Sequence, residues 1–265
     1  MILVSLWQWI GRGVLKFFKE IGTHAILLVR ILRILINGRT VWRDRRLILD
    51  QMLRIGVHSL PLISIVSIFT GAVSSWQAAY QFRGIIAGEM MMDFVGASVS
   101  AAIFIELAPV LAGIVVAGRV GASIAAELGT MRVTEQIDAL ETLAIDPIRY
   151  LVAPRFIAGW TMLPILVIYA CLVAHIGAYG IAFLLLNIST ETFFGSIRRH
   201  FLVYNVFSGL VKAFVFGGGT ALIGCSIGIR TNAGAEGVGK ATIRAFVYSS
   251  AFILIGDYIL AMILF

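Results

Sequence analysis

The sequence predicts an all-α fold, a polytopic bundle of helices that crosses a lipid bilayer several times. Hydrophobic residues make up 60% of the 265 residues and charged residues only 13%, whereas soluble domains average about 45 to 50% and about 25%. The apolar residues also gather in long stretches between charges, and about 20 such residues are enough to cross the hydrocarbon core. A soluble fold could not bury this much apolar surface, so we expect a membrane protein.

Five stretches are long and apolar enough to be transmembrane helices. They are residues 55–81, the stretch between Asp93 and Arg119, and residues 156–190, 201–229 and 245–265. Pro164 lies inside the third stretch, where we expect a kink and not a break, because neighbouring helices can satisfy the carbonyl that proline leaves free.

The segment before the first span has a different pattern. Between Arg12 and Arg33, five cations fall on one arc of a helix, while the large apolar side chains lie mostly elsewhere. Such a basic amphipathic helix is expected to lie in the membrane interface; a sixth span is the alternative. We therefore interpret the chain as one domain, with residues 1–50 as an interfacial and cytoplasmic segment and residues 51–265 as the five-span bundle.

The distribution of Lys and Arg predicts the orientation. Ten precede the first span, four lie in residues 119–155 and three in residues 230–244, whereas the loops between hold only three. The positive-inside rule then puts the N-terminus in the cytoplasm, and five spans put the C-terminus outside. The net charge of +7 is explained by orientation and lipid headgroups, so no nucleic-acid partner is expected.

Three charged residues fall inside the predicted spans: Glu106, Lys212 and Asp257. A charge at mid-bilayer costs at least about 2.5 kcal/mol on insertion scales, so each should have a partner or face a cavity. Their depths along the spans agree, which permits contact between them. Lys212 and Asp257 could form a structural ion pair between helices, while Glu106 is the stronger candidate for a functional group in a polar pocket.

The longest cytoplasmic connection, residues 118–154, predicts a short amphipathic helix. Thr134 is a candidate N-cap, and Asp146-Pro147 would end the helix. Apolar residues recur at helical spacing: Ile137, Leu140 and Leu143 or Ala144. Acidic residues would face the cytoplasm: Glu135, Asp138 and Glu141. This face is either a solvated surface resting on the membrane or a docking surface for a cytoplasmic partner.

Residues 234–241, GAEGVGKA, come close to the phosphate-binding loop pattern but have Ala241 where a magnesium-binding hydroxyl is needed. The segment also follows a membrane helix and not a strand, so we expect a flexible cytoplasmic turn. With no nucleophile, metal or other nucleotide pattern, we predict that the chain is not an enzyme and holds no catalytic residue, metal or cofactor. His58 and His175 are interpreted as hydrogen-bonded packing residues. Cys171 and Cys225 are interpreted as packing residues as well.

At the outer end of the first span, Trp76 and Tyr80 are interpreted as interface aromatics, with a substrate entrance as the alternative. A proton relay through Glu106, Asp257 and His175 would make the chain an ion-coupled secondary transporter. The amphipathic cytoplasmic helix and the absence of an obvious inverted repeat disfavour that hypothesis. A scaffold that only anchors partners is a third possibility.

Residues 106–140, ELAPVLAGIVVAGRVGASIAAELGTMRVTEQIDAL, and the following Asp146-Pro147 resemble the MlaE (YrbE-like) permeases of bacterial lipid-transport ABC systems. The resemblance covers nearly the whole chain, including the basic N-terminal helix and the final span with Asp257. It implies an inner-membrane permease that forms a homodimer and binds a cytoplasmic ATPase dimer, where ATP and Mg²⁺ reside. It also implies a periplasmic MCE-domain partner, a small cytoplasmic accessory subunit as a further candidate, and a role in outer-membrane lipid asymmetry.

The resemblance also assigns residues to roles. Glu106 and Leu107 would line a lipid cavity between two permease copies, with Trp76 and Tyr80 as candidates beside it. The short cytoplasmic helix would be the coupling helix that seats in the ATPase. The residues implied in coupling are Glu127, Thr134, Glu135, Gln136, Ile137, Asp138, Leu140 and Glu141. The substrate would be a phospholipid or a related lipid.

Overall fold

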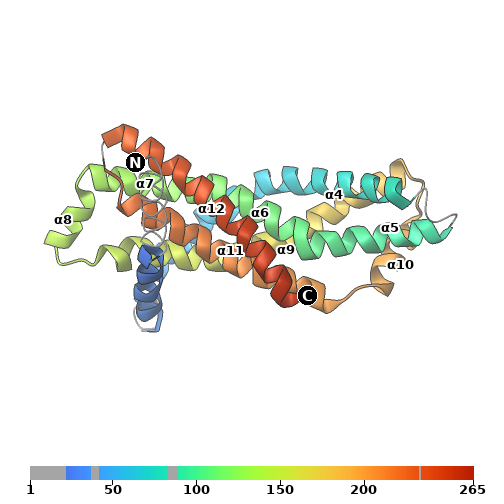
Figure 1. Ribbon diagram of the computed structural model, residues 1–265, viewed down its shortest axis with the longest axis horizontal. Coiled ribbons are helices and arrows are strands. Elements are labelled where there is room, and N and C mark those ends of the chain that lie inside the picture. Colours follow the sequence, from blue (N-terminus) through green and yellow to red (C-terminus); the bar gives the residue numbers. More distant parts are fainter. Residues whose placement is uncertain (1–21, 37–41, 83–88, 233) are drawn as a thin grey trace, which may run out of the picture.

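A computed structural model describes residues 22–36, 42–82, 89–232 and 234–265. This part of the chain is mainly helical and contains no β-strand. Five of its helical stretches are long and apolar enough to cross a membrane. Figure 1 shows them along the longest axis of the molecule, with the last one, α12, running obliquely. The predicted all-α membrane bundle is therefore confirmed.

Each span is built from one or more helices. The first comprises α3 (Arg45–Ile55), a 3₁₀ turn (Val57–Ser59) and α4 (Leu60–Phe82). The second comprises α5 (Glu89–Ala102), α6 (Ala108–Val116) and α7 (Ala122–Val133), joined by π-helical turns at Ile103–Leu107 and Ala117–Gly121. The third comprises a π-helical turn (Ile148–Val152) and α9 (Ala153–Leu184), and the last two are α11 (Val203–Ile229) and α12 (Gly234–Leu264). Between the spans lie the short helices α8 (Gln136–Thr142) and α10 (Thr190–Arg199).

The second span is longer than the sequence predicted. Its helix continues past Arg119 to Val133, so the connection expected at residues 118–154 shrinks to residues 134–147. The helix persists because α7 packs against α11: a Cβ on Gly224 or Gly228 would crowd the backbone of α7 and of the turn before it. The charge of Arg119 marked the end of the apolar stretch, but it did not mark the end of the helix.

The glycine-rich segment at residues 234–241 is also helical. It forms the first turns of α12, where Ala241 is buried and Lys240 pairs with Glu236 at 2.5 Å. The prediction of a flexible turn at these residues is therefore wrong. An i, i+4 ion pair of this kind supports a helix and leaves no open loop to wrap a phosphate.

The short cytoplasmic helix α8 begins and ends differently from the prediction. Thr134 does not cap it, because its hydroxyl donates back to the carbonyl oxygen of Thr130 at 2.8 Å. Glu135 takes a left-handed conformation, with φ of 59°, and α8 starts at Gln136. The helix ends at Thr142, before Asp146-Pro147.

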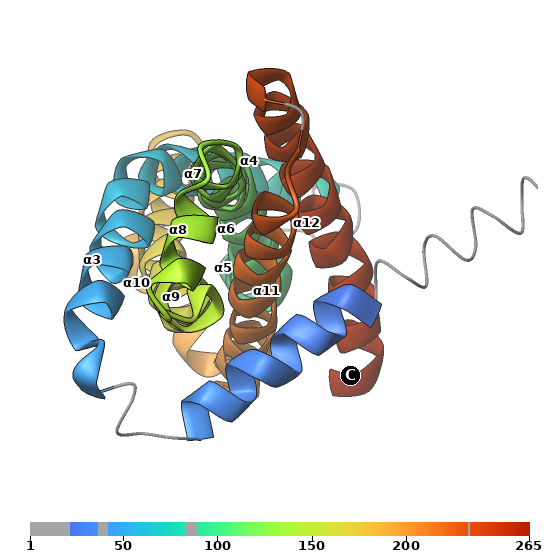
Figure 2. The same ribbon diagram turned by 90° about the vertical axis from the view of Figure 1, so that its left-hand side faces the viewer.

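The N-terminal helix, residues 22–36, lies across the long axis of the bundle (Figures 1 and 2). Ile31 is buried against the hydrophobic core, whereas Arg30 and Arg33 are exposed. This placement fits an interfacial helix better than a sixth span. The other cations of the predicted arc, Arg12, Lys16 and Lys19, lie outside the described residues.

The third span lies at the centre of the bundle. Helix α9 packs on α4 and α11, and Pro164 lies within it without ending it. In contrast, α12 is peripheral, since only 11% of its apolar stretch is buried, against 61% for α11. One long apolar helix face therefore has no partner among the residues that the structure describes.

Candidate functional site

Three intramembrane charges meet at one point of the bundle. The Nζ of Lys212 lies 2.8 Å from Oε1 of Glu106 and 2.8 Å from Oδ1 of Asp257. The Lys212 side chain is fully buried, whereas that of Glu106 is 42% exposed. The structure thus brings Lys212 and Asp257 together and adds Glu106 to the same cluster. With all three groups ionised, the cluster carries a formal charge of −1.

Local backbone geometry builds this cluster. Glu106 lies on the π-helical turn Ile103–Leu107 between α5 and α6, and such turns are frequent at functional sites. A Cβ on Gly209 of α11 would overlap the carbonyl oxygen of Phe104. This close approach, one helical turn before Lys212, brings the lysine to the glutamate. Leu107 lies on the same turn and is partly buried.

The aromatic candidates lie on another helix. Trp76 and Tyr80 are exposed near the end of α4, at the end of the molecule opposite α8 (Figure 1). No hydrogen bond or ion pair connects them to Glu106 within the part of the chain that the structure describes. Their exposed rings fit either an interface belt or the rim of a substrate path.

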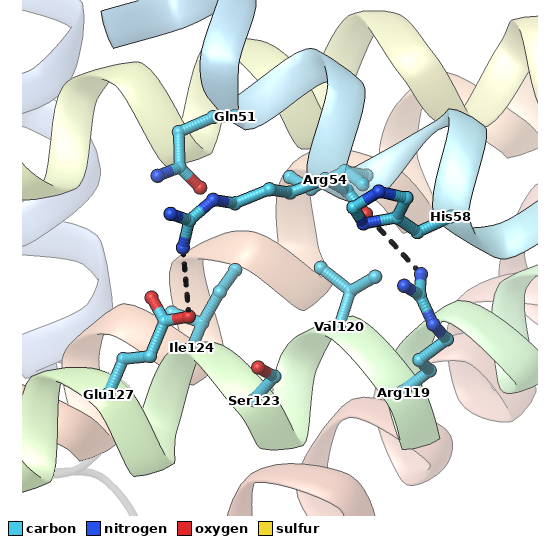
Figure 3. Close-up of a pocket in the computed structure, with 9 residues that line it drawn as sticks. Gln51, Arg54, His58, Arg119, Val120, Ser123, Ile124 and Glu127 are labelled. Carbon is cyan, nitrogen blue, oxygen red and sulfur yellow. Dashed lines mark hydrogen bonds and ion pairs between the residues drawn. The ribbon is translucent and has the colours of Figure 1, made fainter.

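A polar cavity of about 420 Å³ lies at the other end of the spans (Figure 3). Its lining residues come from two segments: Gln51, Arg54, Ile55 and His58, and Arg119, Val120, Ser123, Ile124 and Glu127. The sequence singled out His58 and Glu127 but did not connect them with the other residues of this group, because Arg54 and Arg119 served only as boundaries of spans. The signal available was that both arginines border apolar stretches at the same predicted membrane surface.

Glu127 connects three helices through its carboxylate. Oε2 accepts a hydrogen bond from Arg155 of α9 at 3.0 Å, and Oε1 lies 3.4 Å from Nη1 of Arg54 in α3. The Arg155 side chain is only 9% exposed, so this carboxylate neutralises a nearly buried cation. Glu127 therefore belongs to α7 and its neighbours, and not to the short helix α8.

Helix α8 projects beyond the ends of the spans (Figure 1). Ile137 is buried and Leu140 packs against the hydrophobic core, whereas Glu135 and Glu141 are exposed, as are Thr134 and Gln136. Asp138 forms an ion pair with Arg132 at the end of α7. This arrangement fixes the apolar side of α8 on the bundle and leaves acidic groups on its outer surface.

The two histidines have different surroundings. In His175, Nδ1 lies 2.7 Å from the carbonyl oxygen of Cys171, and Nε2 lies 3.0 Å from Oγ of Ser100. Its ring also packs on Phe104, as expected of a packing residue. His58, in contrast, is exposed at the polar cavity. The packing interpretation is therefore wrong for His58, because the turn Val57–Ser59 carries it away from the core.

Comparison with known proteins identifies the family. The family model described as Permease MlaE matches residues 48–263. The chain belongs to the MlaE permease family. A probable ABC transporter permease protein of Rickettsia typhi is 39% identical over 100% of this chain and 99% of its own length. A protein of the same description from Synechocystis is 40% identical over 98% of this chain and 94% of its own length.

A third relative comes from a plant. The chloroplastic protein TRIGALACTOSYLDIACYLGLYCEROL 1 of Arabidopsis thaliana is 36% identical over 89% of this chain and 65% of its own length. Together with the five apolar helices, these likenesses make the MlaE-family chain a multi-pass ABC transporter permease. Such a permease works with ATPase partners.

Proposed function

We propose that this MlaE-family permease moves phospholipids or related lipids between the inner and outer membranes of a bacterium, driven by a cytoplasmic ATPase dimer. The observation that carries the proposal is the Lys212 cluster. It places a partly exposed carboxylate, that of Glu106, inside a membrane span. Intramembrane charges of this kind mark substrate pathways. The Arabidopsis relative, named after a galactolipid, supports a lipid as the substrate class.

A second copy of the chain is the proposed partner for the exposed face of α12. Large apolar side chains are exposed along this helix: Ile243, Val247, Leu254, Ile255, Tyr258, Ile259, Met262 and Ile263. Asp257 lies in the same helix, so a homodimer formed around α12 would enclose the Lys212 cluster near its axis. Glu106 and Leu107 would then face a cavity with both polar and apolar walls, which suits an amphipathic substrate.

The movement of the ATPase partner would be transmitted to the permease through α8. ATP and Mg²⁺ belong to the ATPase partner, which would contact the exposed Glu135 and Glu141. Because Ile137 anchors α8 and Asp138 pairs with Arg132, a push on α8 would be transmitted to α7. Glu127 would pass the movement to α3 and α9 through Arg54 and Arg155. Lipid affinity must differ between the resulting states for coupling to occur.

The proposed setting is the bacterial inner membrane, with the N-terminus in the cytoplasm and the C-terminus in the periplasm. A periplasmic MCE-domain protein would receive or deliver the lipid, and a small accessory subunit could bind on the cytoplasmic side. The main alternative, a proton relay that includes His175, has less support. Both ring nitrogens of His175 already have partners in Cys171 and Ser100.

The coupling role of α8 can be tested with the permease and its ATPase partner reconstituted in vesicles. We expect Glu135→Gln to lower the lipid moved per ATP hydrolysed by about tenfold, since losing one interfacial charge pair costs about 1.5 kcal/mol or more. Thermal unfolding should not change, because Glu135 is exposed. A fluorescent phospholipid and released phosphate would be measured together.

Glu236→Gln is the matched control, because Glu236 is an exposed acid near the same end of the molecule and forms an exposed pair with Lys240. It should leave the ratio of lipid to ATP unchanged. Unaltered coupling in Glu135→Gln would contradict the role of α8. Lipid movement driven by a pH gradient without ATP would favour the secondary transporter instead.

A further inference from the structure

The polar cavity between α3 and α7 has the size of a ligand site. Its volume of about 420 Å³ falls within the range of about 300 to 1,000 Å³ that is usual for small-molecule pockets. Helix α3 packs on α9, and the side chains of Arg54 and Arg119 reach across the space between the two lining segments. The cavity is therefore bounded by side chains from residues 51–58 and 119–127.

Positive charge is in excess around this cavity. Among the described residues, Glu127 is the one carboxylate that lines it, and Arg155 and Arg54 both pair with Glu127, at 3.0 Å and 3.4 Å. Arg119 instead donates to neutral groups, the Oγ of Ser59 at 2.6 Å and the carbonyl oxygen of Arg54 at 3.4 Å. The charged residues that line the cavity, Arg54, Arg119 and Glu127, thus carry a formal charge of +1, and Arg155 lies behind Glu127 as a further cation.

The side chains that line the cavity offer several hydrogen-bond donors to an anion. Figure 3 shows the Arg119 guanidinium beside His58 at one end of the cavity, and the Arg54 guanidinium beside Gln51 toward the other end. Ser123 adds a hydroxyl between them. Guanidinium groups bind phosphate oxygens with paired, charge-assisted hydrogen bonds, and are preferred for this over ammonium groups.

We propose that this cavity binds a phosphate group, either that of a phospholipid headgroup in the cytoplasmic leaflet or free inorganic phosphate. As a lipid site, it deepens the proposed function and rests on it. The cavity would hold the phosphate at the membrane surface, whereas the Lys212 cluster lies deeper in the bundle, on the proposed path of the lipid.

The surroundings of the cavity favour the lipid as the source. Leu53 and Val57 flank Arg54 and His58 in sequence, and both are exposed apolar side chains. Acyl chains could cover them while the phosphate enters between Arg54 and Arg119. An inorganic phosphate would leave these apolar groups uncovered.

The test is native mass spectrometry of the full-length chain, released from detergent micelles with phosphatidylglycerol, diacylglycerol or inorganic phosphate as the probe. We expect Arg119→Gln to weaken phosphatidylglycerol binding by about tenfold, because a lost charge-assisted hydrogen bond is worth about 1.5 kcal/mol or more. Diacylglycerol, which lacks the phosphate, should bind equally to both proteins. Arg119→Lys keeps the charge, so its affinity for phosphatidylglycerol should lie between those of the unaltered chain and Arg119→Gln.

Arg198→Gln is the matched control, because Arg198 is an exposed arginine on α10, which lies at the opposite end of the molecule from α8 (Figure 1). Its phosphatidylglycerol binding should equal that of the unaltered chain. If only inorganic phosphate binding depends on Arg119, the phosphate site stands and free phosphate is its ligand. If neither probe depends on Arg119 in a variant that unfolds like the unaltered chain, the proposal is overturned.

This assay needs no ATPase and no transport. Binding that depends on Arg119, in a complex that moves no lipid, would uphold the phosphate site and refute the proposed function. Lipid movement without such binding would uphold the proposed function and refute the phosphate site. The two proposals therefore fail separately.

Discussion

Replacing Lys212 with methionine should lower the free energy of unfolding by about 3 to 5 kcal/mol and abolish lipid movement. Lys212 is fully buried and lies 2.8 Å from both Glu106 and Asp257. Without it, two carboxylates would face each other inside a membrane span, and removing one partner of a buried ion pair costs about this much. Unfolding in detergent and lipid transfer in vesicles would measure the two effects.

A triple variant separates stability from function. Adding Glu106→Gln and Asp257→Asn to Lys212→Met removes every charge of the cluster, so most of the lost stability should return. Lipid movement should stay absent if the charges serve the substrate. Lys240→Met is the control, since the pair of Lys240 with Glu236 is exposed and its loss should change stability little. Normal transport by the triple variant would show that the cluster is only structural.

Gly177→Ala is the second change with a large expected effect. A Cβ on Gly177 of α9 would overlap the carbonyl oxygen of Ile68 in α4, and backbone cannot give way as a flexible side chain can. Gly71 makes the reciprocal approach from α4 to Ala174. Forcing these two helices apart should cost about 1 to 3 kcal/mol, as overpacking of a core does. Thermal unfolding of the purified permease would show the loss.

Gly180→Ala tests the same substitution three residues further along α9. No atom lies within 4 Å of a Cβ built on Gly180, so alanine meets no obstacle there. It should leave stability unchanged or raise it by about 0.5 to 1 kcal/mol, because glycine costs about that much in the middle of a helix. Equal effects at both positions would mean that the crossing of α4 and α9 is not tight.

Particular residues show how far the sequence could predict the fold. The five spans were predictable because a bilayer requires about 20 apolar residues at each crossing, a purely local property. The ends of the helices were not. Arg119 marked the predicted end of the second span, yet it has partners in the fold and the helix continues to Val133. Residues 234–241 were expected to form a flexible turn because clustered glycines favour one locally. In the structure they form the first helical turns of α12.

The candidate site was also predictable only in part. The cost of burying charge predicted from sequence that Glu106, Lys212 and Asp257 need partners, and similar depths permitted a contact. The π-helical turn and Gly209 decided that one lysine meets both carboxylates. The polar cavity was not predictable, because Arg54 and Arg119 are 65 residues apart in the chain and no local pattern connects them.

The sequence by itself therefore determined the membrane location, the number of spans, the family and the need for paired intramembrane charges. Each of these depends on composition, or on residues near one another in the chain. Only the tertiary structure decided which charges meet, where the helices end and where a cavity opens between α3 and α7. The first two features depend on backbone approach at glycines such as Gly209 and Gly224, which is a property of two helices and not of either one alone.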